Sequence, residues 1–250
     1  MPPGKAGSLT GSGQLCYQAG MSELVLSVIV PALDAAAHLP ASLAALDEAR
    51  RAGLLREVLV VDGGSSDATA EVAARAGARV LAGPRGRGQQ LSAGAAAAAA
   101  DWLLFLHADT VLGPGWVAAA RAFMARPEAR QRAAVFRLAL DDPDPRARRI
   151  ERLAGWRARA LGLPYGDQGL LISRAFYQGL GGFRPLALME DVEFMRRIGR
   201  ARLVTLEAEA LTSAARYRAG GWWLRPLRNL SLLGLYFLGA PPKLLQRLYG

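Results

Sequence analysis

The stretch "LLFLHADT" (residues 103–110) ends an apolar run in a histidine and a carboxylate. A short apolar run bounded by turn-forming residues is typical of a buried strand, and "VLGPGW" follows here. We therefore expect a strand to end near His107. The carboxylate of Asp109 then lies at a strand end, where it is either a cation ligand or the acidic start of a turn. The stretch alone leaves both interpretations open.

Three further apolar runs precede this one, namely "LVLSVIV" (24–30), "EVLVV" (57–61) and "ARVLAG" (78–83). Helical patterns separate them, over residues 39–52 and 67–76 and in an alanine-rich stretch that reaches residue 100. Strands that alternate with helices predict an α/β fold with a mostly parallel sheet and helices on both faces. Such sheets bind ligands at the carboxyl ends of their strands, where Asp62 and Asp109 are expected.

The chain changes character after about residue 130. A strand "AAVFRLAL" (133–140), an arginine-rich helix, a loop "GLPYGDQGLLIS" (162–173) and a helix "LMEDVEFMRRIGR" (188–200) are predicted. The last of these carries Glu190, Asp191 and Glu193 near its start, where the helix dipole favours carboxylates. They are either ordinary first-turn residues or candidates for a general base, which typically contributes roughly 100- to 10,000-fold to a rate.

Composition limits the classes of partner. The chain has 250 residues, is 52% hydrophobic and carries a formal charge of +10 that is almost wholly arginine. A GC-rich genome accounts for part of that bias, and the rest fits anionic partners such as phosphates or an acidic membrane face. Nucleic acid is not expected, because the arginines are spread along the chain without a recognisable binding module.

The metal-binding residue types are few. Cys16 is the single cysteine, and His38 and His107 are the two histidines. A metal site must therefore use mainly oxygen ligands, which favours magnesium or manganese. Residues 1–20 lack the apolar core of a signal peptide, so we expect a cytoplasmic protein whose residues 1–22 form a flexible tail.

Nucleotide-binding signals are mixed. The turn "PALDAAAH" (31–38) contains no glycine, so the dinucleotide fingerprint is absent, and no Walker A sequence occurs. In "VVDGGSSDAT" (60–69), Asp62 ends a strand, Gly63 allows backbone to approach a ligand, and a serine or aspartate can cap a helix. A tight turn with a cap explains the same residues. "GPRGRGQQ" (83–90) adds Arg85 and Arg87 in a loop that is either solvated or suited to a phosphate.

Taken in order, seven motifs resemble those of family 2 glycosyltransferases with the GT-A fold. They are "SVIVPALDAAAHLPASLAAL", "EVLVVDGGSSDAT", "GPRGRGQQLSAGA", "LLFLHADT", "YGDQG", "GGF" and "LMEDVEFMRRI", and they extend from about Ser27 to Arg216. More narrowly, "VDGGSSD", "GPRGR", "FLHADT", "PYGDQG" and "LMEDVE" look like a small bacterial subfamily. That subfamily is labelled arsenosugar-biosynthesis or radical-SAM/selenodomain-associated glycosyltransferases.

The resemblance implies transfer of a sugar, with inversion, from a nucleotide-diphosphate sugar. By the same resemblance, Asp191 is the catalytic base and Asp109 binds a manganese or magnesium ion as the last member of a DxD motif. The resemblance places the donor beside Pro31, Ala32, Asp34, Asp62, Gly63, Arg85, His107 and Arg216. It places the acceptor beside Gly166, Asp167, Gln168 and Glu190.

Two positions depart from the family pattern. His107 replaces the first aspartate of DxD, so we expect either weaker metal binding or a direct contact between His107 and phosphate. Asp34 stands where asparagine or glutamate is commoner, which leaves the choice of nucleobase open.

The resemblance also divides the chain into the tail, a GT-A domain over residues 23–216 and an amphipathic helical segment over 217–250. The apolar stretch "LSLLGLYFLGA" (230–240) is far shorter than the roughly 20 residues that span a bilayer. Residues 222–250 are therefore expected to pack on the domain or on a second subunit, or else to lie on the membrane surface as an interfacial helix pair. A small-molecule or a lipid acceptor fits these alternatives.

Two other functions are compatible with parts of the sequence. "VVDGGSSD" faintly resembles the loop of a SAM-dependent methyltransferase, although that loop normally follows the first strand. A non-catalytic GT-A-like adaptor at the membrane surface is the second alternative, because the metal motif is altered. The retained Asp109 and Asp191 favour an enzyme.

Overall fold

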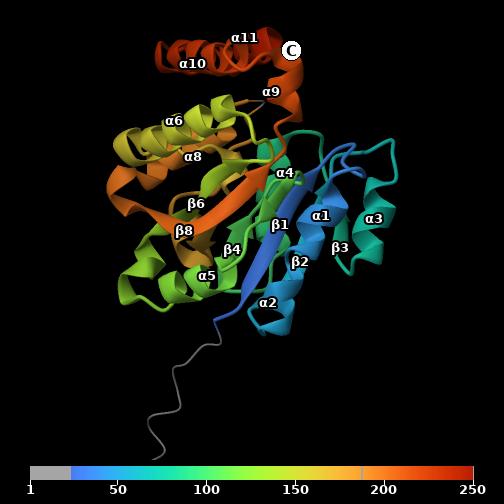
Figure 1. Ribbon diagram of the computed structural model, residues 1–250. Helices are drawn as coiled ribbons and strands as arrows, with labels where there is room; N and C mark the ends of the chain where they lie inside the picture. The colour runs from blue at the N-terminus through green and yellow to red at the C-terminus, as the bar shows by residue number, and fades with distance from the viewer. Residues whose placement is uncertain (1–23, 187, 250) are drawn as a thin grey trace, which may run out of the picture.

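The computed structural model describes residues 24–186 and 188–249, so the predicted tail lies outside the described residues. One eight-stranded mixed sheet organises this part of the chain, in the order β3-β2-β1-β4-β7-β6-β8-β5 (Figure 1). The strands are β1 (Leu26–Ala32), β2 (Leu55–Asp62), β3 (Arg79–Ala82), β4 (Trp102–Phe105), β5 (Thr110–Leu112), β6 (Ala133–Leu140), β7 (Leu170–Ser173) and β8 (Leu203–Thr212).

The first four strands form the parallel part of the sheet. β1 pairs in parallel with β2 and β4, and β2 pairs in parallel with β3. β7 then enters antiparallel between β4 and β6, while β6 and β8 run parallel to each other. Every residue of β1 and β4 is buried, which agrees with their apolar sequences because a central parallel strand is covered on both faces.

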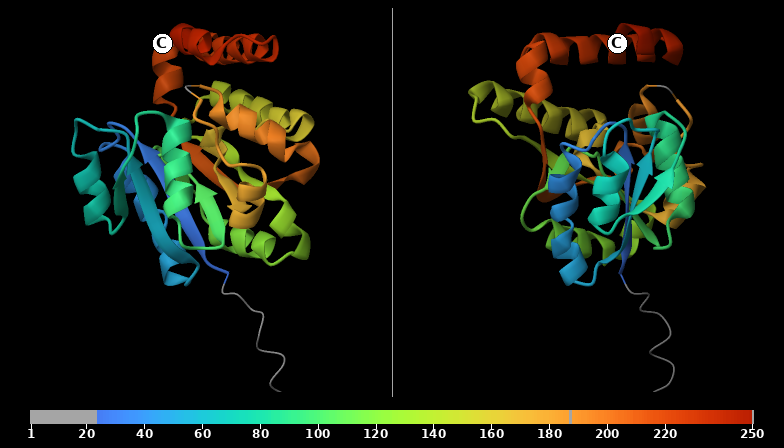
Figure 2. Two further views of the ribbon diagram at one scale, coloured as in Figure 1. Left: turned by 180° about the vertical axis from the view of Figure 1, so that it is seen from behind. Right: turned by 90° about the vertical axis from the view of Figure 1, so that its right-hand side faces the viewer.

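Helices cover both faces of the sheet, as predicted (Figure 2). They are α1 (Leu39–Ala44), α2 (Asp47–Arg51), α3 (Thr69–Arg75), α4 (Arg87–Ala97), α5 (Trp116–Met124), α6 (Pro145–Leu161), α7 (Arg174–Gly179), α8 (Glu190–Ile198), α9 (Ala215–Gly220), α10 (Leu224–Phe237) and α11 (Pro242–Tyr249). One core packs α1, α2, α3 and α5 against the sheet, and the other packs α4, α7 and α8 against its opposite face.

The helix predicted over residues 39–52 divides in two. The carbonyl oxygen of Ala45 accepts a hydrogen bond from Trp116 Nε1 at 3.2 Å. α1 ends at Ala44 and α2 begins at Asp47, so this carbonyl lies in the break between them. The contact with Trp116 is between elements far apart in the sequence, so it leaves no local signal in the sequence.

The segment from α9 to α11 lies at one end of the molecule, beside α6 (Figure 1, red). A small third core of Leu140, Ala147, Ala214 and Trp222 joins this segment to β6 and α6. The Tyr217 and Trp222 rings stack with their centroids 6.0 Å apart. None of the helices within residues 24–186 and 188–249 is both long enough and apolar enough to cross a membrane.

Candidate active site

The parallel strands bring their carboxyl ends to one edge of the sheet. Ala32 and Asp62 are register partners at the ends of β1 and β2, and Leu106 N donates to Ile29 O just beyond β4. Gln90 of α4 fixes the first two ends, because its Nε2 donates to the carbonyls of Ala32 and Val61 at 2.8 Å each. The turns after β1 and β4 are therefore held side by side.

An outer pocket of about 620 Å³ opens at this edge. It is lined by Pro31, Ala32, Leu33, Asp34, Ala35, His38, Arg85, Gly86, Arg87, Gln90, His107, Ala108, Asp109, Leu188 and Glu190. Its lining comes from the turns after β1, β3 and β4 and from the start of α8. This is the edge at which the sequence predicts a donor site.

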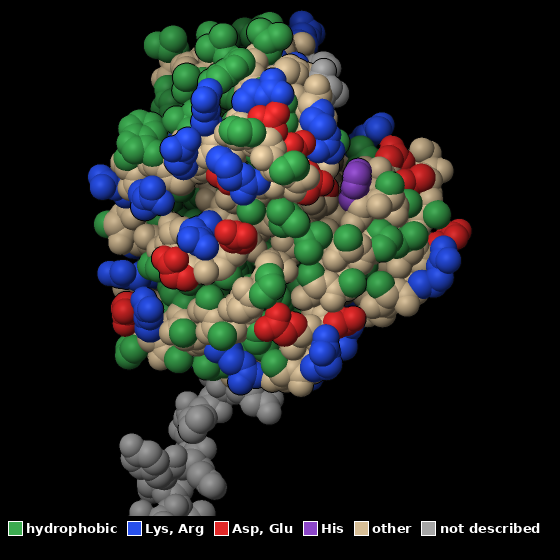
Figure 3. Space-filling model, viewed as in Figure 1, with side chains coloured by type: hydrophobic (Ala, Val, Ile, Leu, Met, Phe, Trp, Pro, Cys, Tyr) green, Lys and Arg blue, Asp and Glu red, His purple; other side chains and the backbone are tan. Residues whose placement is uncertain are grey.

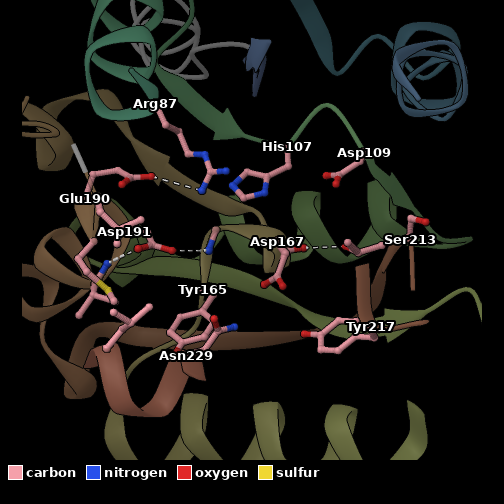
Figure 4. A pocket seen from close by; sticks show the side chains of 16 residues that line it. Arg87, His107, Asp109, Tyr165, Asp167, Glu190, Asp191, Ser213, Tyr217 and Asn229 are labelled. Carbon is pink, nitrogen blue, oxygen red and sulfur yellow. Dashed lines mark hydrogen bonds and ion pairs between the residues drawn. The ribbon is translucent and has the colours of Figure 1, made fainter. Parts of the chain in front are cut away.

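A smaller inner pocket of about 140 Å³ continues from it (Figure 4). The two pockets share Arg87, His107, Asp109, Leu188 and Glu190. The inner pocket adds Tyr165, Gly166, Asp167, Met189, Asp191, Val192, Thr212, Ser213, Tyr217, Asn229 and Leu232. A molecule bound in the outer pocket therefore has one end beside the carboxylates of the inner pocket.

Arg87 and Glu190 face each other where the pockets meet. Arg87 Nη1 lies 3.5 Å from Glu190 Oε1, and each residue is the first of its helix. Gly88 permits this approach, because a Cβ there would lie 2.5 Å from the carbonyl oxygen of Arg184 and 3.2 Å from Glu190 Cβ. Burial and the nearby Asp191 raise the pKa of Glu190 to about 6.

Asp191 lies on the opposite side of the inner pocket from Asp109 (Figure 4). Its Oδ2 accepts from Gly166 N at 3.0 Å, and its Oδ1 accepts from Val192 N at 2.7 Å. Gly166 packs closely against the histidine, because a Cβ there would lie 2.5 Å from His107 Nε2 and would force a shift. The "GDQG" loop thus packs against the histidine and orients the carboxylate at once.

Asp167 is the fourth carboxylate of the inner pocket. Burial of its carboxyl group raises its pKa to about 6, with Asp191 and Asp109 acting in the same direction and Arg157 against them. Its Oδ1 is closed off from solvent and has no hydrogen-bond partner within the described part of the chain. A buried acceptor without a partner is unusual, and a donor group of a ligand would reach this oxygen only after the side chain rotates toward the pocket.

Asp109 is the candidate metal ligand, and His107 is its neighbour in the altered DxD motif. Asp109 is half-buried between β4 and β5, and the turn is anchored by Ser42 Oγ, which donates to Ala108 O at 2.8 Å. Among residues 24–186 and 188–249, no cluster of three or more carboxylate, histidine or cysteine side chains is arranged as a metal site. The donor set fits magnesium or manganese, which commonly use one or two carboxylates and complete their shell with phosphate oxygens and water.

Several predicted donor residues line the outer pocket, namely Pro31, Ala32, Asp34, Arg85 and His107. Asp34 is engaged with the neighbouring turn, since its Oδ1 accepts from Ser66 N at 2.7 Å. These bonds from Ser66 hold the pKa of Asp34 below its usual value.

Asp62, Gly63 and Gln168 lie outside the pocket linings. The Asp62 carboxylate accepts from the backbone and hydroxyl of Ser65. Gln168 is buried, and its Nε2 donates to Phe136 O at 3.0 Å. Asp62 and Gln168 therefore hold the loops that carry the site. The prediction for Arg216 falls on a side chain outside the described residues.

Other lining residues are absent from the predicted site. Arg87 sits in the same basic loop sequence as Arg85, and only the start of α4 distinguishes the two. Tyr165 directly precedes the "GDQG" motif, whose residues were predicted to lie beside the acceptor. Tyr217 and Asn229 come from α9 and α10, and no local pattern connects them with the strand ends.

Comparisons with known proteins identify the family of the chain and its fold. Residues 27–181, more than half of the chain, match the sequence profile described as Glycosyl transferase family 2. The chain therefore belongs to glycosyl transferase family 2. The matched region contains β1 to β4, the histidine-aspartate turn and the "GDQG" loop, and ends before α8.

Curated relatives include uncharacterized glycosyltransferases of Mycobacterium bovis and Mycobacterium tuberculosis. Each is 41% identical to this chain over 91 residues, which is 36% of this chain and 39% of the relative. The chain thus matches about two fifths of the length of these relatives.

Among solved structures, glucosyl-3-phosphoglycerate synthase of M. tuberculosis with Mn²⁺, UDP and glucosyl-3-phosphoglycerate aligns with a TM-score of 0.55 and 20% identity, over 76% of this chain and 71% of that one. The same enzyme with Mg²⁺ and UDP gives a TM-score of 0.56 and 22% identity, over 76% and 70% of the chains. At this identity the likeness establishes the fold, which is the GT-A glycosyltransferase fold.

Proposed function

We propose that this protein transfers a sugar from a nucleoside-diphosphate sugar to an acceptor hydroxyl, with inversion at the anomeric carbon. The observation that carries the proposal is the junction of the two pockets. Arg87, His107 and Asp109 line both, and Asp191 faces the junction from the inner side. The nucleotide occupies the outer pocket, and the acceptor enters the inner one.

The proposed reaction is a single displacement. The acceptor oxygen forms a bond to the anomeric carbon while the bond from that carbon to the diphosphate oxygen breaks. Asp191 takes the proton of the acceptor hydroxyl, and the hydrogen bond from Gly166 N keeps its carboxylate oriented. Arg87 and His107 lie where the negative charge of the departing diphosphate develops.

Asp109 would hold a divalent cation, with phosphate oxygens and water as the other ligands. A bound magnesium or manganese ion supplies neutralisation of the leaving diphosphate without a protonated acid. Four carboxylates line the inner pocket, whereas among the described residues Arg87 is the one arginine or lysine in its lining. Such a negative pocket favours a cation.

The two alternative functions are a methyltransferase and a non-catalytic adaptor. Membership of family 2 removes the ground for a methyltransferase. A non-catalytic adaptor keeps the same fold, and it is distinguished by turnover of the donor. The narrower subfamily resemblance and a cytoplasmic location stay predictions.

The first test is thermal stabilisation of the purified protein by nucleotides and nucleotide sugars, with and without manganese. The first ligands to test are UDP and UDP-glucose, because solved structures of the same fold contain them. A ligand that binds only the folded state stabilises it by about 2.7 kcal/mol at a hundredfold excess over its dissociation constant.

Asp109→Ala is expected to abolish the manganese-dependent part of the shift. Asp101→Ala is the matched control, because this exposed aspartate lies at the other end of β4. No shift with any nucleotide, or equal shifts in both variants, would overturn the assignment of the donor and metal sites.

A further inference from the structure

A third cavity, the α6–α10 groove, lies between those two helices and has a volume of about 350 Å³. Its walls are mainly apolar, with Leu153 and Trp156 on α6 and Leu227, Leu230 and Leu233 on α10. In Figure 3, apolar side chains gather over the end of the molecule that α10 and α11 form. The groove is therefore a hydrocarbon-like surface beside a polar catalytic pocket.

The groove adjoins the inner pocket. Tyr165, Asp167, Tyr217 and Asn229 line both cavities. α10 itself forms a wall of each, since Asn229 and Leu232 face the inner pocket while Leu227 and Leu230 face the groove. One molecule can therefore occupy both spaces, with its polar end near Asp191.

The apolar walls are uncovered. The exposed fractions are 54% for Trp156, 60% for Leu227 and 62% for Leu230. Contiguous exposed apolar surface on a folded protein generally marks a binding site. The uncovered side chains come from both walls, so the same occupant can bury them together.

The neck between the cavities has the opposite chemistry. Asp167 Oδ1 and Asn229 Oδ1 are buried and accept no hydrogen bond from the described residues. A side-chain rotation that brings either atom to the surface of the neck lets a hydroxyl-bearing group donate to it, which a hydrocarbon cannot do. The order along the path is therefore carboxylates, then unsatisfied acceptors, then an apolar groove.

We propose that the acceptor is an amphiphile whose hydroxylated head enters the inner pocket and whose hydrocarbon tail lies in the α6–α10 groove. This inference rests on the proposed glycosyl transfer, because it identifies the inner pocket as the acceptor side. A second copy of the chain would cover the apolar walls, but it would leave the continuity with the inner pocket and the unsatisfied acceptors at the neck without a role.

The test uses n-alkyl β-glucosides with tails of four to eight carbons, below their micelle concentrations, as probes. Binding is measured through tryptophan fluorescence, since Trp156, Trp222 and Trp223 line the groove. Burial of a methylene group predicts about fourfold tighter binding for each added carbon. Dissociation constants independent of tail length would overturn the proposal.

Leu227→Gln on α10 and Leu153→Gln on α6 test the two walls separately, and both are expected to flatten the dependence on tail length. Leu238→Gln is the matched control, because Leu238 is 85% exposed and lies outside the groove lining. Equal effects in all three variants would contradict the assignment of the groove. All three positions are exposed, so the variants are expected to fold.

Two further measurements separate the competing outcomes. Stabilisation by the nucleotide with manganese is expected to be unchanged in the groove variants. If the nucleotide with manganese does not stabilise the parent protein either, the proposed function fails, and that outcome is distinct from a failure of the groove assignment. Light scattering gives the mass in solution. A dimer that Leu227→Gln dissociates would show that a second copy covers the groove and would overturn the inference.

Discussion

Arg87 and Glu190 are 103 residues apart in the sequence and form an ion pair at the junction of the two pockets, with 3.5 Å between Nη1 and Oε1. Glu190 is buried and Arg87 is half-exposed, so the carboxylate holds the guanidinium in place while leaving part of it open to the outer pocket. The pair therefore links the start of α4 to the start of α8.

Arg87→Ala is expected to raise the KM for the sugar nucleotide by about tenfold to a hundredfold, because a hydrogen bond to a charged group contributes about 1.5–3 kcal/mol. Steady-state kinetics with the donor that stabilises the protein measures the effect. Arg75→Ala is the control, since this arginine is exposed on α3 and pairs with Glu71 away from the pockets. An unchanged KM in Arg87→Ala would contradict the role given to the pair.

Asp191→Asn is expected to lower kcat by about 100- to 10,000-fold while donor binding persists, because the amide cannot take a proton. The asparagine oxygen can still accept from Gly166 N, so the loop is expected to remain in place. The control is Glu193→Gln on the same helix. Glu193 pairs with Arg184 and Arg197 outside the pocket, so this variant is expected to lose stability and keep its kcat. Donor turnover by Asp191→Asn at the parent rate would contradict the role of Asp191 as the base, whereas absence of turnover in the parent protein would favour the adaptor hypothesis.

Gly166→Ala is expected to weaken donor binding and turnover together. Its new Cβ would lie 2.5 Å from His107 Nε2, so either the imidazole or the loop that orients Asp191 must move. Gly234→Ala is the matched control, because nothing lies within 4 Å of a Cβ at that position in α10. The control should stabilise the protein by about 0.5–1 kcal/mol, the usual gain from replacing glycine inside a helix. Similar activity in both variants would show that the close packing of Gly166 against His107 is not needed for activity.

How far the sequence predicts this arrangement depends on the range of each interaction. The run that ends in His107 and Asp109 predicts a strand end, and β4 and its turn confirm it. β7 is different, because its place between β4 and β6 depends on pairings that no local pattern specifies. Likewise, Asn229 reaches the inner pocket only through the packing of α10.

Asp167→Asn should alter the pH dependence of stability in the metal-free protein. The pKa of Asp167 is raised to about 6 in the folded state, whereas an unfolded aspartate titrates near 4. The stabilising effect of the protonated acid is therefore fully present below about pH 4 and is lost as the pH rises through about 6.

At pH 7 the variant is expected to be more stable than the parent by about 2–3 kcal/mol, since each pKa unit corresponds to about 1.4 kcal/mol. At pH 4 the two should be nearly equal. Urea unfolding at both pH values measures the difference. An equal difference at the two pH values would mean that the carboxyl group does not titrate in this range.

The division of the pockets along the chain has a practical consequence. Within the described residues, the outer pocket draws its lining from positions up to Glu190, whereas α9 and α10 contribute only to the inner pocket and the groove. Exchanging the segment from residue 217 onward, which keeps the predicted donor residue Arg216, for that of another family member is therefore a route to engineer a different acceptor while the original sugar donor is retained. Selection in nature can act on the same division, so donor and acceptor choice can diverge independently.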